Sequence, residues 1–441
     1  MTQERAEQWV DVVVLGAGMS GLVSASVLID QGAKKILVVD EYDRVGGNHI
    51  DEAINGYTFD VGSLIFQDDS PLVERFPELM NSYVLITPTW QRLNPQGLVA
   101  KYPLSIRDDI ISAGPIEWVR MALSVIYGRL FRRELRNARD FAEHWLGARF
   151  AWRTGLLRYM ERLCGMSPEL IDLKFAQSRM GWIPEHARLG TQLRGLIPLR
   201  RSTRIPSPPN RQLVRPRSGF AELYRPVTDR LAANGVELSL GQSLQGLQRD
   251  GNGFILRTAS RVIHCDRIVS TVPLDVVLRL IGVQQDPLPT VTLVTLFYSF
   301  AGDRGFDSPV LYNFAHDGTW KRLTVHSDYY GEADGRQFFA VEVIDGENEP
   351  SIERAGRQFR EHTTANGLFA GDLRLEGGNV LTNAYPIFTA GSVERSRDAI
   401  AQLKAFGIES HGRQGGFEYQ PTARHSTHVA ERALGARGPA A

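Results

Sequence analysis

At 441 residues, the chain is longer than one hydrophobic core usually supports, so its length predicts two or three domains. Lysine plus arginine and aspartate plus glutamate each total 50, so the chain lacks the net positive charge that drives non-specific binding of nucleic acid. Its two cysteines, Cys164 and Cys265, suit neither a disulfide framework nor a CxxC metal site, which predicts a reducing compartment and no bound metal.

The opening segment predicts a strand, a helix and a second strand, formed by the apolar stretches 10–15, 22–29 and 36–39. The connection between the two strands is too long for a hairpin and suits parallel pairing. The polar N-terminus lacks the basic and apolar regions of a secretion signal.

Later segments alternate in character along the chain. The pattern becomes helical over 106–180. The longest apolar run in that region, 110–131, is interrupted by Gly114, Pro115, Glu117 and Arg120, so we expect no membrane span and a cytoplasmic enzyme. A loop with seven arginines and no acidic residue is expected over 194–217. The other expected elements are a helix at 220–233, strands at 236–240, 254–258 and 267–271, a second sheet from 290–300, 322–326 and 337–343, and a last helix at 425–434.

A glycine motif, Gly16-Ala17-Gly18-Met19-Ser20-Gly21, directly follows the first strand and opens the first helix. In this context Gly16 permits a tight turn, Gly18 lets the backbone approach a pyrophosphate, and Gly21 lets the helix pack on the strand. The helix N-terminus presents free N–H groups to the phosphates. Asp40 ends the second strand, where a carboxylate can bind both ribose hydroxyls. The motif therefore predicts a dinucleotide site.

A second glycine-rich stretch follows, Asp43-Arg44-Val45-Gly46-Gly47-Asn48, and later Gly56-Tyr57-Thr58-Phe59-Asp60-Val61-Gly62. Together with the first motif it resembles the FAD-binding signature of amine oxidases, phytoene desaturases, protoporphyrinogen oxidases and UDP-galactopyranose mutases. The resemblance implies an α/β fold, with a Rossmann-type FAD-binding domain like that of glutathione reductase, an inserted helical domain and a second antiparallel sheet. The cofactor-binding residues that it implies are Gly16, Gly18, Met19, Ser20, Gly21, Asp40, Glu41, Gly46, Gly47, Asn48, Gly62, Ser63, Arg413, His425 and Ser426.

Within that group, the C-terminal region resembles a UDP-galactopyranose mutase of the eukaryotic type. The order of its segments carries the resemblance: Ala384-Tyr385-Pro386, then Gly412-Arg413-Gln414-Gly415-Gly416-Phe417-Glu418-Tyr419, then His425-Ser426. The segments 89–92, 101–104, 270–274 and 320–329 resemble earlier parts of the same family. Carried over by position, Arg179 and Arg322 match arginines that clamp a substrate diphosphate, and Tyr329, Tyr385 and Tyr419 match tyrosines that hydrogen-bond it.

The chain departs from the mutases at two places. The segment 62–67 has no histidine, where mutases place one beside the flavin, and Tyr102-Pro103-Leu104-Ser105 stands in place of the YPF-Gln segment that helps to seat uridine. A different nucleotide base or a different reaction therefore stays open.

The resemblance implies a flavoenzyme that interconverts the pyranose and furanose forms of a nucleotide sugar, with reduced FAD as the N5 nucleophile and NAD(P)H as a candidate reductant. The alternatives are an FAD-dependent oxidoreductase of the amine oxidase or protoporphyrinogen oxidase type and a non-catalytic flavin-binding subunit. The sugar, the base, the physiological reductant and the oligomeric state are left open. The expected division is FAD-binding parts at 1–88, 212–280 and 381–441, a mostly helical substrate domain at 89–211 and a substrate-domain sheet at 281–380.

Overall fold

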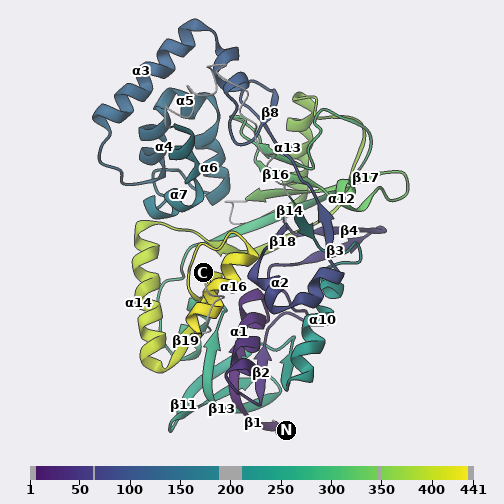
Figure 1. Ribbon diagram of the computed structural model, residues 1–441, viewed down its shortest axis with the longest axis vertical. Coiled ribbons are helices and arrows are strands. Elements are labelled where there is room, and N and C mark those ends of the chain that lie inside the picture. The colour runs from purple at the N-terminus through teal and green to yellow at the C-terminus, as the bar shows by residue number, and fades with distance from the viewer. Residues whose placement is uncertain (1–5, 63–64, 188–210, 345–348, 436–441) are drawn as a thin grey trace, which may run out of the picture.

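The computed structural model describes residues 6–62, 65–187, 211–344 and 349–435 and has two large sheets, one in the lower and one in the upper part of Figure 1. Helices cover both, so the fold is of the mixed α/β class that the sequence predicts. The N-terminus lies at the lower edge, and the C-terminal helix returns to the middle of the molecule.

The lower sheet has seven strands, and its central strands are parallel. Its order is β10 (Val236–Ser239), β2 (Ile36–Val39), β1 (Ala6–Leu15), β13 (Arg261–Ser270), β12 (Gly253–Thr258) and β11 (Leu244–Asp250), with β19 (Ile408–Ser410) paired to β13. All four residues of β2 are buried, as expected for a parallel strand covered on both faces.

Helices cover both faces of this sheet. One face packs on α1 (Met19–Asp30), α10 (Phe220–Ala233) and α16 (Ala423–Ala433). The other packs on α11 (Leu274–Leu280) and α14 (Ala390–Phe406). This is the doubly covered arrangement in which ligands bind at the carboxyl ends of the parallel strands.

The upper sheet also has seven strands, in the order β18 (Phe369–Pro386), β14 (Thr290–Arg304), β17 (Gln337–Ile344), β16 (Trp320–Val325), β15 (Val310–Asn313), β7 (Trp90–Leu93) and β8 (Val99–Lys101). Its neighbouring strands are antiparallel except for β7 and β15, which run parallel. Strand β7 joins the sheet from a part of the chain far from β15 in sequence. Helix α13 (Ile352–Ala365) packs on one face of the sheet through an aromatic-rich core.

The predicted helical region forms a compact group beside this sheet (Figure 1). Its core shares buried side chains with β15, so the helices are fixed against the sheet rather than tethered to it. The helices are α3 (Pro115–Phe131), α4 (Ala138–Leu146), α5 (Ala148–Arg153), α6 (Leu156–Cys164), α7 (Leu173–Arg179) and α8 (Trp182–Ala187).

Strong local patterns gave accurate boundaries. The helix predicted at 220–233 is α10, and the strands predicted at 236–240 and 254–258 are β10 and β12 within one residue at each end. The strand predicted at 267–271 begins earlier, at Arg261. The elements that were not predicted include the long strand β18, helix α14, and the hairpin of β3 (Asp51–Ile54) with β4 (Tyr57–Asp60). Most of the arginine-rich stretch 194–217 lies outside the described residues, and the five-segment division stays a prediction.

Among the described helices, no single one has the length and apolar character to cross a bilayer. One pair of helices, 107–113 and 115–131, reaches that length and composition together, but the two axes are bent by 116°.

Candidate active site

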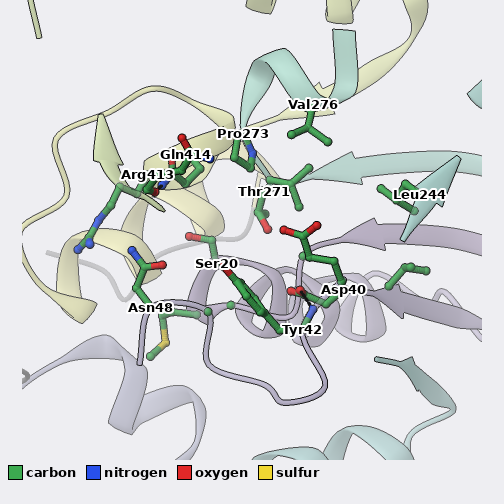
Figure 2. Close-up of a pocket in the computed structure, with 18 of the residues that line it drawn as sticks. Ser20, Asp40, Tyr42, Asn48, Leu244, Thr271, Pro273, Val276, Arg413 and Gln414 are labelled. Atoms are coloured by element: carbon green, nitrogen blue, oxygen red, sulfur yellow. Dashed lines mark hydrogen bonds between the residues drawn. The ribbon is translucent and has the colours of Figure 1, made fainter. Parts of the chain in front are cut away.

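A cavity of about 580 Å³ opens where β1 turns into α1. In Figure 2, Arg413 and Asn48 lie at one end of it, and Asp40 and Leu244 lie at the other. The structure brings together eleven of the predicted cofactor residues along this cavity: Gly16, Gly18, Met19, Ser20, Asp40, Glu41, Gly46, Gly47, Asn48, Arg413 and Ser426.

Glycines create the space at the cavity floor. A Cβ on Gly21 would lie 1.8 Å from the carbonyl oxygen of Gly16, so only glycine lets α1 pack this closely on the turn. A Cβ on Gly47 would lie 3.0 Å from the Cα of Gly18, so the two glycine turns touch backbone to backbone. Gly18 is the N-cap of α1 and lines the cavity. The free N–H groups of the first helical turn therefore face a site that a diphosphate can enter.

Asp40 is held in place by two backbone hydrogen bonds. Its Oδ2 accepts from the Ala17 N–H at 2.6 Å, and its Oδ1 accepts from the Tyr42 N–H at 2.9 Å. Burial raises the pKa of this carboxyl, and the backbone bonds act against that rise. The carboxylate is thus fixed at the end of the cavity opposite Arg413, where the motif places a ribose.

His49 also lines the cavity, although the sequence analysis overlooked it. Its ring is hydrogen-bonded to the Tyr224 hydroxyl. Burial lowers the pKa of His49 to about 3, with a smaller contribution from Arg413, so the imidazole is neutral near pH 7. Its position two residues after the second glycine pair was the signal that could have identified it.

Three predicted cofactor residues lie elsewhere. Gly21 is behind the turn, Gly62 follows β4, and the exposed His425 is hydrogen-bonded to Thr422 at 2.8 Å; none of the three lines the cavity. Ser63 lies outside the described residues. Their roles in cofactor binding stay predictions.

A second cluster of polar side chains adjoins the cavity through Tyr419. Burial raises the pKa of the Tyr419 phenol, while the positive charges of Arg179 and Arg413 act to lower it. Tyr419 therefore lies within electrostatic reach of both guanidinium groups, one of which lines the cavity. The five predicted substrate residues (Arg179, Arg322, Tyr329, Tyr385 and Tyr419) are all partly rather than fully buried.

The Arg322 guanidinium on β16 is held by Glu342 on β17. Its Nε donates to the Glu342 carboxylate at 2.7 Å, and the Lys321 ammonium lies 2.6 Å from the same carboxylate. Burial would raise the pKa of Glu342, but Arg322 and Lys321 together lower it to about 2. The carboxylate is therefore charged at neutral pH and links the two cations.

Aromatic side chains surround the arginines. Tyr102 and Tyr312 stack with ring centroids 4.2 Å apart, and the Arg322 guanidinium lies 5.7 Å from the Tyr312 ring centroid. The Arg179 Nη2 donates to the Tyr159 hydroxyl at 3.3 Å. Burial raises the pKa of Tyr102 to about 12, which keeps this phenol protonated near pH 7.

The hydroxyls of Tyr385 and Tyr329 differ in their partners. The Tyr385 hydroxyl donates to the Leu163 carbonyl at 3.0 Å and accepts from the Lys321 ammonium at 3.4 Å. The Tyr329 hydroxyl is buried and has no hydrogen-bond partner among the described residues. Burial raises the pKa of Tyr329, with a smaller opposing effect of the Arg322 charge, so the hydroxyl stays protonated and is an unused donor near Arg322.

The sequence analysis missed four members of this cluster: Tyr159, Tyr312, Lys321 and Glu342. Glu342 did have a signal, because it is a charged residue within an otherwise apolar strand. Lys321 is adjacent to a predicted residue. Tyr159 and Tyr312 lie on segments far apart in the chain and meet only in the fold.

A doubly covered parallel sheet with a glycine-lined cavity, beside a second sheet that carries a cationic cluster, is an arrangement that flavoproteins use. Comparison with known proteins agrees. The flavin containing amine oxidoreductase family matches residues 19–300, and the chain belongs to this family.

Solved structures extend the likeness over the whole fold. The structure of a reduced UDP-galactopyranose mutase is 18% identical and has a TM-score of 0.77, with 96% of this chain and 94% of that chain covered. A putrescine oxidase bound to putrescine is 14% identical with a TM-score of 0.61, with 97% of this chain and 99% of that chain covered.

A sequence relative matches a shorter stretch. Prolycopene isomerase 2 of an Oncidium hybrid cultivar is 42% identical over 62 residues, which is 14% of this chain and 10% of the isomerase.

FAD is the cofactor of this flavoprotein, as predicted. The residues at the cavity fit it: the helix N-terminus and Arg413 would hold the diphosphate, and Asp40 would bind the adenosine ribose. The chain shares the fold of oxidoreductases and of a mutase, so the fold by itself does not choose between their reactions.

Proposed function

We propose that the chain is an FAD-dependent mutase that interconverts the pyranose and furanose forms of a nucleotide sugar. The observation that supports this best is the cationic and phenolic cluster around Arg179 and Arg322, which adjoins the cofactor cavity through Tyr419. Planar guanidinium groups bind phosphate oxygens in pairs, and phenols add directed donors.

The charges of the cluster suit a diphosphate. Arg179, Arg322 and Lys321 supply three positive charges, and Glu342 supplies one negative charge. The excess of two positive charges would be uncompensated among these groups until an anion binds. A nucleoside diphosphate supplies that charge, whereas a polyamine or another cationic amine would be repelled.

Reduced FAD, when bound, would supply the nucleophile for the anomeric carbon of the sugar. The protein would stabilise the negative charge that develops on the leaving diphosphate, with Arg179 and Arg322 as the main contacts. Tyr102, Tyr329, Tyr385 and Tyr419 would remain protonated and serve as hydrogen-bond donors. The buried tyrosine rings would exclude water from the diphosphate and strengthen each charged contact.

The reduced UDP-galactopyranose mutase structure supports this proposal at the level of fold. Because its sequence is only 18% identical, support for the activity comes from the residues of the site. The changed segment Tyr102-Pro103-Leu104-Ser105 leaves the base open, so the substrate is proposed only as a nucleoside diphosphate sugar.

The test is direct. Purified protein with bound FAD is reduced with dithionite and incubated with UDP-, TDP- and GDP-pyranoses, and furanose products are sought by chromatography. We expect one of these donors to be converted without net oxidation. Absence of turnover with every donor, while FAD remains bound, would contradict the mutase assignment.

The second candidate is an FAD-dependent oxidoreductase, which the family match favours. An oxidase would consume oxygen and release peroxide when its substrate is added to the oxidised protein. A mutase requires the reduced cofactor and consumes no oxidant. Oxygen uptake with amines, compared with furanose formation by the reduced protein, therefore distinguishes the two.

A further inference from the structure

Helix α3 presents an apolar face to the outside of the molecule. It is the outermost element of the helical group at the upper left of Figure 1. The side chains exposed on α3 are Ile116, Trp118, Val119, Leu123, Ile126, Tyr127, Leu130 and Phe131, each at least 42% exposed. No described segment packs over these side chains.

The inner side of the same helix accounts for its attachment to the fold. Met121 and Gly128 are buried against the neighbouring helices, and a Cβ on Gly128 would lie 2.4 Å from the Glu143 carbonyl oxygen. Because Gly128 has no side chain, this face of α3 packs closely on α4. The residues at 116, 119, 123, 127 and 130 follow helical spacing on the other face and are not needed for this packing.

The size of this exposed face is unusual for a protein that meets only water. Five of these apolar residues, at 116, 119, 123, 127 and 130, follow helical spacing along one side of the 17-residue helix, and Ile126 and Phe131 flank them. Surface patches of this kind mark a binding surface. Apolar area is unfavourable in contact with water, and binding to a partner removes it from water.

Positive charges border the stripe. Arg107 lies before α3, Arg120 lies within it and Arg133 lies just after it, and all three are exposed. Each of the nearby carboxylates except Asp108 has an arginine partner, and Arg120 is itself one of the two partners of Glu117. Glu117 is hydrogen-bonded to Arg149 and Arg120, Asp109 is buried with Arg92, and Glu134 pairs with Arg136, which leaves Asp108 as the remaining acidic neighbour.

We propose that α3 binds the surface of a bilayer that contains anionic lipids. The helix lies parallel to the membrane plane, its apolar face enters the boundary between headgroups and acyl chains, and Arg107, Arg120 and Arg133 contact anionic headgroups. Tyr127 on the exposed face is a residue type that favours this interface. The 116° bend between 107–113 and α3 agrees with a helix that lies on the membrane rather than crossing it.

A second copy of the chain suits this face less well. In an antiparallel pair, the Arg107 end of one α3 would meet the Arg133 end of the other, and in a parallel pair each end would meet itself. Like charges would lie together in both arrangements. Anionic headgroups supply negative charge at every point around the stripe, so the bilayer is the complementary partner.

The experiment uses the FAD-bound full chain and large unilamellar vesicles of phosphatidylcholine, with or without phosphatidylglycerol. We expect the protein to sediment with the phosphatidylglycerol vesicles, more weakly with phosphatidylcholine alone, and less in high salt. Leu123→Glu and Tyr127→Glu should each lower the partition constant at least about tenfold, which is the effect of losing one fully buried apolar side chain. Arg120→Gln should weaken binding only to the anionic vesicles.

The matched control is Leu85→Glu, the same apolar-to-acidic change at a side chain that is 53% exposed on β6 (Val84–Ile86), away from α3. It should sediment with vesicles as the parent does, and flavin absorbance should be the same in all variants. Absence of vesicle binding by the parent would overturn the proposal. A dimer that Leu123→Glu dissociates, together with no vesicle binding, would instead assign this face to a second copy of the chain.

Discussion

The partly buried Arg322 and the buried Glu342 form a hydrogen-bonded ion pair between neighbouring strands, with the Arg322 Nε 2.7 Å from the Glu342 carboxylate. The pair fixes the guanidinium before any ligand arrives, so little side-chain freedom remains to be lost on binding. The same carboxylate holds Lys321, which makes Glu342 the residue that positions both cations.

Replacing Arg322 by alanine should weaken the binding of a nucleoside diphosphate by about 1.5 to 3 kcal/mol, the value of a charged hydrogen bond, or about 10- to 150-fold in Kd. Calorimetric titration of the oxidised protein with UDP, TDP and GDP would measure this. Arg374→Ala removes an exposed arginine from β18 and should leave the affinity unchanged. If the Arg322 variant binds as tightly as the parent, Arg322 does not contact the diphosphate.

Tyr329 and Tyr385 should respond differently to loss of their hydroxyls. Tyr329→Phe removes a buried hydroxyl that has no partner among the described residues, so it should lower diphosphate affinity about two- to tenfold while stability is kept or increased. Tyr385→Phe also removes the bond to the Leu163 carbonyl, so it should lower both affinity and the free energy of unfolding. Thermal denaturation and titration of the two variants would show whether this split occurs.

Alanine substitutions at Gly18 and Gly21 should have different effects, one on flavin binding and the other on folding. A Cβ on Gly18 would lie 3.5 Å from the nearest described atom, at Gly47, so Gly18→Ala should fold but lose FAD because the methyl group occupies the path of the diphosphate. Gly21→Ala would place its Cβ against the Gly16 carbonyl and should prevent the soluble fold from forming. A Gly18 variant that purifies with a full complement of FAD would contradict the proposed route of the diphosphate.

Buried His411 should make the fold sensitive to acid. Burial lowers the pKa of His411 to about 4, and the ring is hydrogen-bonded to Ser24 at 2.9 Å. In the unfolded chain its pKa is near 6.5, so between about pH 6.5 and 4 the unfolded state binds one more proton than the folded state at this site. The free energy of unfolding should therefore fall with decreasing pH by up to about 1.4 kcal/mol per pH unit from this residue.

Denaturant titrations between pH 7 and pH 5 would measure that slope. His411→Asn should reduce it by close to one proton, whereas the same change at the exposed His428 should leave it unaltered. An unchanged slope in the His411 variant would show that this imidazole does not account for the acid sensitivity.

The sequence by itself determined the dinucleotide half of this protein. One short strand–helix–strand unit contains Gly16, Gly18, Gly21 and Asp40. Because the unit is local, the spacing of these residues in the sequence predicts where they lie relative to one another in the fold. The same locality explains why α10 was predicted with its correct ends, since its apolar period and its flanking residues are all within the helix.

Only the tertiary structure decided the second cluster and the outward face of α3. Arg179 ends a helix, Arg322 lies on a strand and Tyr419 follows a turn far along the chain, so nothing in their spacing measures how near they lie. Glu342 and Tyr312 become partners of Arg322 through strand pairing and ring contact. The apolar pattern of α3 suits either a buried helix or an exposed one, and only the packing of its Gly128 side on α4 shows which face remains outside.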